Sequence, residues 1–207
     1  MTDYITVLKS VTAEYSEKRS RFIATLYHCE TEAQATEIIS QQKSRFWDAK
    51  HNVYAYVLKD GTSRFSDDGE PHGTAGKPIL DIITGSGVSD IIIVVTRYFG
   101  GVLLGTGGLV RAYSSAARDA VNLSQRVKMC NGATYSVKCD YADHSKLISV
   151  IEKCNGSVKD TLFTELVEVL FSLKNEDIKN FEDTLCEVFS SRLTANFVQE
   201  SVFCQKI

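Results

Sequence analysis

The chain has 207 residues, of which 43% are hydrophobic and 24% charged, and its formal net charge is −3 at pH 7. This length allows one large domain or two small ones, and the composition is ordinary for a globular protein. Residues 1–128 carry 15 basic and 14 acidic side chains, a net charge of +1, whereas residues 129–207 carry 8 and 12, a net charge of −4. Neither half is basic enough to bind nucleic acid through charge alone.

The first ten residues, MTDYITVLKS, lack the basic and then apolar pattern of a signal peptide, and the chain has no apolar run of 18 residues. We therefore expect a cytoplasmic protein without a membrane span. Its six cysteines are expected to be reduced thiols. Because they are widely spaced, without a Cys-x-x-Cys pair, they predict small buried side chains rather than a zinc site. The sequence predicts no metal and no cofactor.

Residue periodicity predicts the elements of the first half. Asp60-Gly61 marks a tight turn, because glycine adopts the positive φ that such a turn requires. The expected elements are, in order, a hairpin over residues 4–28 turning at 17–19, a helix over 31–46 capped by Thr31, strands over 51–58 and 62–66, a helix over 74–83 ended by Gly85 and Gly87, a buried strand over 91–95 and a helix over 109–123. Helices that alternate with strands indicate a two-layer α/β domain.

The pattern changes after about residue 129. The expected elements are a strand over 132–140, a helix capped by Asp143 and ended at Asn155-Gly156, strands over 157–165 and 166–174, a helix over 175–189 and a strand over 193–203. The order β-α-β-β-α-β is that of a ferredoxin-like domain. The sequence therefore predicts an α+β protein with domains at 1–128 and 129–207.

Eleven of the 13 glycines lie between Gly61 and Gly108, so the irregular backbone is confined to one region. A glycine-rich segment, 100–108, follows a buried strand and precedes a helix, and its backbone N–H groups and the helix dipole favour an anion there. The second part of this site is expected in residues 66–80. The residues predicted to bind an anion or RNA are Arg97, Tyr98, Gly100, Gly101, Gly105, Gly107, Gly108, Arg111, Thr74, Gly76, Lys77 and Arg21.

Two interpretations of the Arg97-Tyr98-Phe99 segment stay open. An arginine beside two aromatic residues suits a phosphate contact combined with base stacking. Alternatively, the two aromatic side chains pack into the core while Arg97 pairs with an acid such as Asp67 or Asp68.

Four side chains in the loop after residue 66 could form a metal or acid/base group, since carboxylates and imidazole bind divalent ions. They are Asp67, Asp68, Glu70 and His72. An acidic turn next to Gly and Pro is more often a solvated loop or a cap for the following helix, and we favour that interpretation. The neighbouring GTAGKP has a proline where a P-loop needs Ser or Thr, which disfavours an ATPase. For His51, a structural role is the better expectation.

Four segments carry a family resemblance: SRFIA, HNVYAY, SDDGEPHGTAGKPIL and VTRYFGGVLLGTGGLVRAY. Together they resemble the IMPACT family in its two-domain bacterial form, over the entire chain. The resemblance implies an N-terminal domain with the ribosomal protein S5 domain-2-like fold, similar to domain IV of elongation factor G. It also implies a ferredoxin-like C-terminal domain similar to domain V of that factor.

The resemblance implies translational control for eukaryotic members, through a partner of a kinase that phosphorylates an initiation factor. That interaction depends on an additional N-terminal domain, and we do not expect it here. The leading hypothesis is a non-enzymatic protein that binds RNA or the ribosome and modulates translation. The alternative is a small metal-dependent hydrolase or phosphoryl-transfer enzyme that uses Asp67-Asp68-Gly69-Glu70. A third possibility is a protein partner bound by the sheet of the acidic C-terminal domain. Oligomeric state is not predicted.

Overall fold

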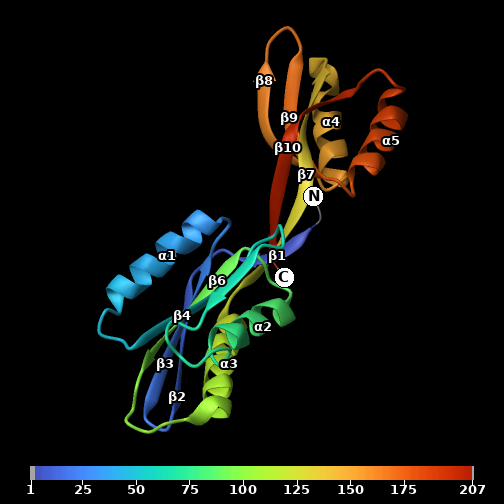
Figure 1. Ribbon diagram of the computed structural model, residues 1–207. Helices are drawn as coiled ribbons and strands as arrows, with labels where there is room; N and C mark the ends of the chain where they lie inside the picture. Colours follow the sequence, from blue (N-terminus) through green and yellow to red (C-terminus); the bar gives the residue numbers. More distant parts are fainter. Residues whose placement is uncertain (1–2, 207) are drawn as a thin grey trace. The chain divides into compact units, whose positions relative to one another are not determined.

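The computed structural model describes residues 3–206, and their contacts divide into two compact units. One unit is Tyr4–Val127, and the other comprises Asp3 and Lys128–Gln205. The strands (Figure 1) are β1 (Tyr4–Val7), β2 (Val11–Glu17), β3 (Ser20–His28), β4 (His51–Val57), β5 (Ser63–Ser66), β6 (Ile91–Tyr98), β7 (Arg126–Cys139), β8 (Ser157–Phe163), β9 (Val167–Lys174) and β10 (Ala195–Lys206). The helices are α1 (Glu32–Arg45), α2 (Gly76–Ser86), α3 (Gly105–Leu123), α4 (Tyr141–Lys153) and α5 (Ile178–Phe189). The predicted domain division at residue 128 stays a prediction.

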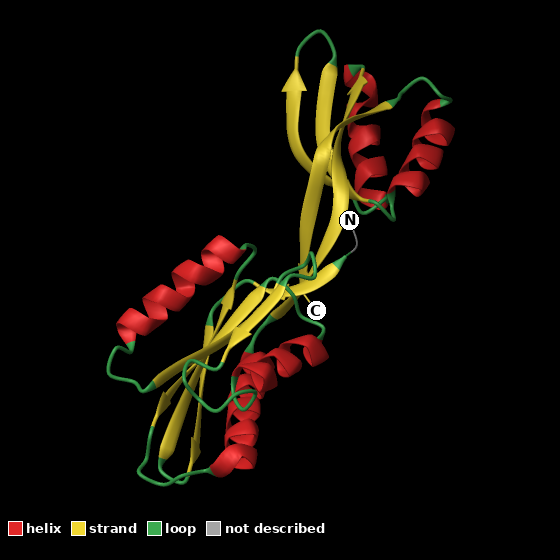
Figure 2. Cartoon of the chain, in the orientation of Figure 1, coloured by secondary structure: helices red, strands yellow, loops and turns green. Residues whose placement is uncertain are grey.

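Strand β6 is the centre of the N-terminal unit. The sheet order is β2-β3-β6-β4-β5, and each neighbouring pair is antiparallel. Ile91, Ile93 and Val95 belong to the cluster under α2 and α3, whereas Ile92 and Val94 pack on the face of α1. Figures 1 and 2 show α1 on one face of the sheet and α2 with α3 on the other. The uninterrupted apolar run follows from burial on both faces, and α1 adds a layer to the two expected.

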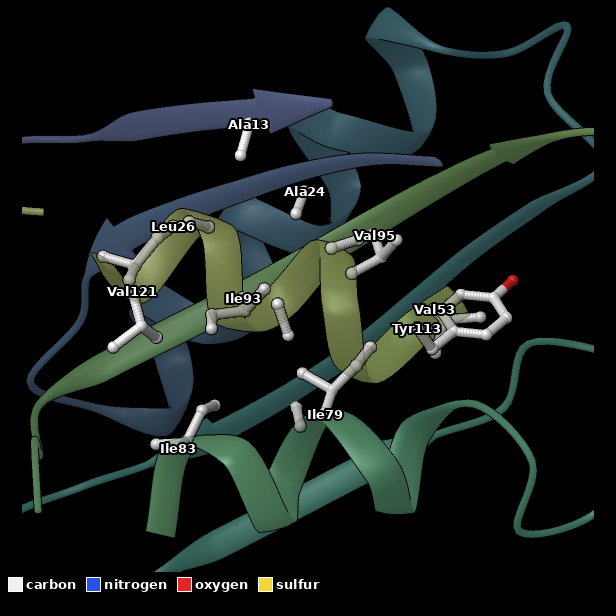
Figure 3. Close-up of a cluster of buried hydrophobic side chains, with 14 of the residues drawn as sticks. Ala13, Ala24, Leu26, Val53, Ile79, Ile83, Ile93, Val95, Tyr113 and Val121 are labelled. Carbon is white, nitrogen blue, oxygen red and sulfur yellow. The ribbon is translucent and has the colours of Figure 1, made fainter. Parts of the chain in front are cut away.

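Helices α2 and α3 share one core with the sheet. Ile79 and Ile83, one turn apart on α2, are fully buried and form the stripe of α2 that faces the sheet (Figure 3). Tyr113 and Val121 of α3 enter the same cluster, and the hydroxyl of Tyr113 points away from it. Burial of each isoleucine contributes about 1.5–3 kcal/mol.

Two local predictions in this unit are confirmed. Thr31 is the N-cap of α1, and its Oγ1 accepts a hydrogen bond from the backbone N–H of Gln34 at 3.2 Å. Strands β4 and β5 pair as a hairpin, and Gly61 in the connecting turn has a φ of 90°. Both follow from local chemistry that the sequence shows directly.

The C-terminal unit has the predicted order β7-α4-β8-β9-α5-β10, so its ferredoxin-like architecture and the α+β class are confirmed. The sheet order is β1-β7-β9-β8, and β10 also pairs with β7. Helices α4 and α5 cover one face (Figure 2). Phe171 of β9 and two residues of α5, Phe181 and Phe189, are fully buried in the core of this unit, and the ring centroids of Phe171 and Phe181 are 4.9 Å apart.

The start of α3 corrects the sequence interpretation. The helix begins at Gly105 rather than at Leu109, so Gly105, Gly107 and Gly108 lie in its first turn and not in a loop. Glycine lowers helix propensity by about 1 kcal/mol per residue, which made this turn look irregular. The seven buried residues of α3 stabilise the helix through packing instead.

Other predicted boundaries are wrong by a few residues or by one strand. Helix α2 continues through Gly85 and is C-capped by Gly87 alone, and α4 is N-capped by Asp140 rather than Asp143. Helix α5 begins at Ile178 rather than residue 175, and β7 begins at Arg126 rather than residue 132. Residues 4–28 form three strands, of which β1 belongs to the other sheet.

Candidate anion-binding site

A hollow of about 360 Å³ lies where β6 ends, and both glycine-bearing segments contribute to it. Its lining residues are Gly69, Glu70 and Pro71 from the acidic loop, Phe99, Leu103, Leu104, Gly105, Thr106 and Leu109 from the segment after β6, and Lys50, His51 and Arg97. The volume falls within the roughly 300–1,000 Å³ of small-molecule sites. The two segments therefore meet at one place, and what they bind stays a prediction.

Arg97 and Glu70 form a buried ion pair at the hollow. Arg97 Nη1 donates to Glu70 Oε1 at 2.5 Å, and the two side chains are 7% and 4% exposed. The hydroxyl of Tyr113 donates to the same oxygen at 2.9 Å. Burial, and then the charge of Glu70, raises the pKa of Tyr113. Arg97 thus pairs with an acid, as one interpretation held, but the acid is neither Asp67 nor Asp68.

The guanidinium of Arg97 also lies near two aromatic rings. Its guanidinium carbon is 5.4 Å from the ring centroid of Phe22 and 5.7 Å from that of Phe99. Its Nε is buried and has no hydrogen-bond acceptor among the described residues. Phe99 is 44% exposed and Tyr98 is half-buried, so the expectation that both aromatic side chains pack into the core is wrong. A buried donor without an acceptor costs about 1–3 kcal/mol.

His51 is brought to the hollow by strand register, because it lies opposite Arg97 in the β4–β6 pair. Its Nδ1 is 2.7 Å from the carbonyl oxygen of Asp68, and because a carbonyl only accepts, Nδ1 is the donor. Its Nε2 lies 3.8 Å from Glu70 Oε1. Gly69, with a φ of 86°, leaves the space beside the imidazole ring free of a side chain. The imidazole is therefore held with Nε2 toward Glu70.

The first turn of α2 is closed by the chain's own carboxylate. Asp67 Oδ1 accepts from the N–H groups of Ala75 and Gly76 at 3.1 and 2.8 Å, and Oδ2 accepts from that of Gly73 at 2.8 Å. The N–H of Thr74 donates to a carbonyl in the same loop. Asp67 thus caps the start of α2, which is one of the two structural roles expected of the acidic turn. The prediction that Gly76 offers its N–H to a ligand is wrong, because Asp67 already accepts it.

The other acidic-loop side chains point to separate partners. Asp68 Oδ1 accepts from Lys43 Nζ at 2.7 Å, and Oδ2 accepts from the backbone N–H of Asn52 at 2.6 Å. His72 is exposed, with its Nδ1 3.7 Å from Asp67 Oδ2. Among residues 3–206, no three His, Cys, Asp or Glu side chains are grouped so that they could hold a metal ion. The loop's carboxylates serve protein donors.

The first turn of α3 differs from that of α2. Its N-cap is Leu104, whose apolar side chain cannot accept a hydrogen bond, whereas Asp67 accepts from the N–H groups of Ala75 and Gly76 at the start of α2. Gly105 and Thr106 of this turn line the hollow. The unsatisfied N–H groups and the positive end of the helix dipole therefore lie beside it.

A second hollow, of about 200 Å³, shares Leu104 with the first. Arg111 and Gly108 line it, together with Lys18 of the β2–β3 turn. Lys18 and Arg111 are both exposed. The start of α3 is thus flanked by two hollows, and three predicted residues of α3 (Gly105, Gly108 and Arg111) lie along them.

Two predicted cationic residues do not line either hollow. Lys77 Nζ is 2.6 Å from Asp81 Oδ1, and Arg21 Nε is 2.6 Å from Glu14 Oε1, each pair being exposed. The hydrogen bonds between Arg21 and Glu14 raise the pKa of the guanidinium. Exposed pairs of this kind contribute little to stability, and the structure does not bring these two residues to the site.

Gly100 has a structural role that the sequence did not show. Its N–H donates to Ser20 Oγ at 3.2 Å, and a Cβ at this position would overlap the backbone of Arg19 in the β2–β3 turn. Gly101, exposed and with a φ of 83°, and Gly107 have open space where a Cβ would be. Of these three glycines, only Gly100 is required by close packing.

Sequence reasoning missed the loop between α1 and β4. The Tyr98 hydroxyl donates to Asp48 Oδ1 at 2.9 Å, and burial, with this bond, raises its pKa. Lys50 Nζ lies 5.6 Å from the ring centroid of Phe99. Trp47 in this loop is 83% exposed. An exposed tryptophan after a helix was the signal available in the sequence, but the contacts across 50 residues were not.

The fold and the site define a two-unit α+β protein in which helix α3 begins beside a hollow. The profile of the "Impact N-terminal domain" matches residues 18–121, and that of the "Domain of unknown function (DUF1949)" matches residues 137–192. An "IMPACT family member" of Haemophilus influenzae is 34% identical, over 96% of this chain and 98% of that protein. "IMPACT family member YigZ" of Escherichia coli is 31% identical, over 97% and 100%. The chain belongs to the IMPACT family.

A solved structure described as "Crystal structure of an hypothetical protein" has a TM-score of 0.63 and 30% sequence identity. The match covers 96% of this chain and 98% of the chain in that structure. Among the helices of residues 3–206, none combines the length and the apolar character needed to cross a bilayer.

Proposed function

We propose that this protein binds RNA in the cytoplasm, free or within the ribosome, and modulates translation without catalysing a reaction. One observation carries the proposal. The open first turn of α3, the buried Arg97 and the exposed Phe99 and Lys50 all line one hollow. Helix N–H groups and cationic side chains bind phosphate, and exposed aromatic rings stack on bases for about 1–3 kcal/mol each.

The charge distribution determines the expected character of this binding. The N-terminal half has a net charge of only +1, so its affinity depends on a few local contacts rather than on a long-range field. Lys18 and Arg111 at the second hollow supply two such contacts near the start of α3. We therefore expect moderate affinity and a small number of phosphate contacts.

The link to translation is supported by family membership, since the resemblance implies translational control for the eukaryotic members. The metal-dependent alternative has no comparable support. Asp67, Asp68 and Glu70 each accept hydrogen bonds from protein donors, so a metal ion would have to displace a helix cap, a lysine or a buried arginine.

The test is the salt dependence of RNA binding, measured by fluorescence anisotropy with a labelled single-stranded RNA and with the full chain. Each phosphate contact contributes a log–log slope of about −0.7 on single strands. Arg111→Gln should reduce the magnitude of the slope by about that amount. Arg118→Gln is the matched control, because Arg118 is also an exposed arginine of α3 but lines neither hollow. No binding of RNA or ribosomes at low salt would refute the proposal.

A further inference from the structure

We propose that the hollow beside α3 binds a terminal phosphate monoester, the group found at a phosphorylated RNA end and on a free nucleoside monophosphate. The inference rests on the proposed RNA-binding function and narrows it, because it assigns this hollow to the terminal nucleotide of an RNA rather than to a nucleotide within the RNA. Three structural observations support it.

The first is the contrast between the two helices that begin at this end of the unit. The first turn of α2 receives a carboxylate from the chain itself, and three backbone N–H groups converge on Asp67. The first turn of α3 also starts with a glycine, although Gly105 has a left-handed φ of 71°, and its N-cap, Leu104, has an apolar side chain that cannot accept a hydrogen bond. Gly105 and Thr106 of this turn line the hollow, so an anion bound there would lie beside the helix N-terminus.

The second is Arg97, which is independent of the helix. Its side chain lines the same hollow and is 93% buried, yet its Nε has no acceptor among the residues that the structure describes. Glu70 neutralises the charge of Arg97 through Nη1 but leaves that Nε–H unused. A ligand oxygen that accepted this hydrogen bond would remove a cost of about 1–3 kcal/mol. The positive charge left over at the hollow comes from Lys50 and from the helix dipole.

The third is the shape and chemistry of the walls. The lining residues include three sources of hydrogen-bond donors, namely the α3 turn, Arg97 and Lys50. A phosphate monoester carries three acceptor oxygens, whereas a phosphodiester inside a strand has two and continues in both directions. Apolar side chains, Leu103 and Phe99 among them, form much of the remaining surface and suit a sugar or base. A terminal nucleotide matches this combination better than a strand passing through.

The experiment uses the full chain and a set of probes that separates the two sources of the group. Anisotropy compares one RNA oligonucleotide made with a 5′-phosphate, a 3′-phosphate or hydroxyl ends. Calorimetry measures AMP and inorganic phosphate. Thr106→Trp fills the hollow from an exposed position, and Val110→Trp is its control, because Val110 is an exposed α3 residue outside both hollows. Arg97→Lys keeps a cation for Glu70 and removes Nε. Circular dichroism confirms that each variant is folded.

We expect about tenfold tighter binding of at least one phosphorylated end than of the hydroxyl ends, and competition by AMP. Thr106→Trp and Arg97→Lys should abolish this preference, while Val110→Trp keeps it. Equal affinity for all ends without AMP binding overturns the inference and leaves RNA binding intact. AMP binding that Thr106→Trp abolishes, without RNA binding, supports the site and refutes the proposed function. An equal loss in both tryptophan variants also overturns the assignment to this hollow.

Discussion

Breaking the ion pair between Arg97 and Glu70 should destabilise the N-terminal unit far more than removing both charges. The side chains are 7% and 4% exposed, so water does not screen them or solvate a partner left alone. Loss of one member of a buried pair costs about 3–5 kcal/mol, because an unpaired charge stays in the interior. We therefore expect that cost for Glu70→Gln and for Arg97→Met. The double variant should lie within about 2 kcal/mol of the wild type, since neither charge remains.

Differential scanning calorimetry measures the effect. At about 3–5 °C per kcal/mol for a unit of this size, each single variant should lower the Tm of one transition by about 10–20 °C. The chain divides into two compact units, so the calorimetric trace is fitted with two transitions. Lys77→Met and Asp81→Asn are the control cycle, because that pair is exposed and each change should stay within about 0.5 kcal/mol. Our reasoning fails if a single variant at the buried pair costs less than 1 kcal/mol, or if the double variant costs the sum of the two.

Three further predictions follow from other contacts. Asp67→Ala should lower the free energy of unfolding by about 1–3 kcal/mol in urea, because three N–H groups lose their acceptor; an unchanged midpoint would contradict the capping role. Gly100→Ala should cost 1–3 kcal/mol or more in the same assay through overlap with the β2–β3 turn, whereas Gly107→Ala should stabilise by up to about 1 kcal/mol; equal effects would be inconsistent with the packing. Burial, and then Asp90, raises the pKa of Tyr4 from 10.0 to about 12, so the folded state holds this proton longer than the unfolded state. That contribution to stability is complete below pH 10 and is lost between pH 10 and about 12. The free energy of unfolding of Tyr4→Phe should therefore fall less steeply over this range than that of the wild type. Parallel curves for the two proteins would refute this prediction.

The elements that local chemistry specifies could be predicted from the sequence. Thr31 was recognised as a cap because its hydroxyl has a donor three residues away, and Asp60-Gly61 because a tight turn needs a positive φ. The ferredoxin-like order followed from strand and helix periods alone. The apolar run at Ile91 predicted a buried strand correctly, since it is covered on both faces.

The features that depend on long-range pairing could not be predicted. The partner of Arg97, Glu70, is 27 residues away in the chain, and the sequence interpretation named Asp67 and Asp68 as examples instead. His51 was assigned a structural role because no serine or cysteine nucleophile was recognised near it, and the sequence does not show that its strand pairs in register with the end of β6. Strand register and loop conformation are decided by packing across the sheet, which a single sequence does not report.

Gly100 has a consequence for how this surface can vary. The loop after β6 rests on main-chain atoms of the β2–β3 turn, and its hydrogen bond goes to the hydroxyl of Ser20. The side chains of Lys18 and Arg19 take no part in that contact and are exposed. Substitutions of Lys18 and Arg19 can change the charge of this surface without changing the contact between the β2–β3 turn and the loop after β6. Affinity at this end could thus be retuned by surface changes that leave the scaffold untouched.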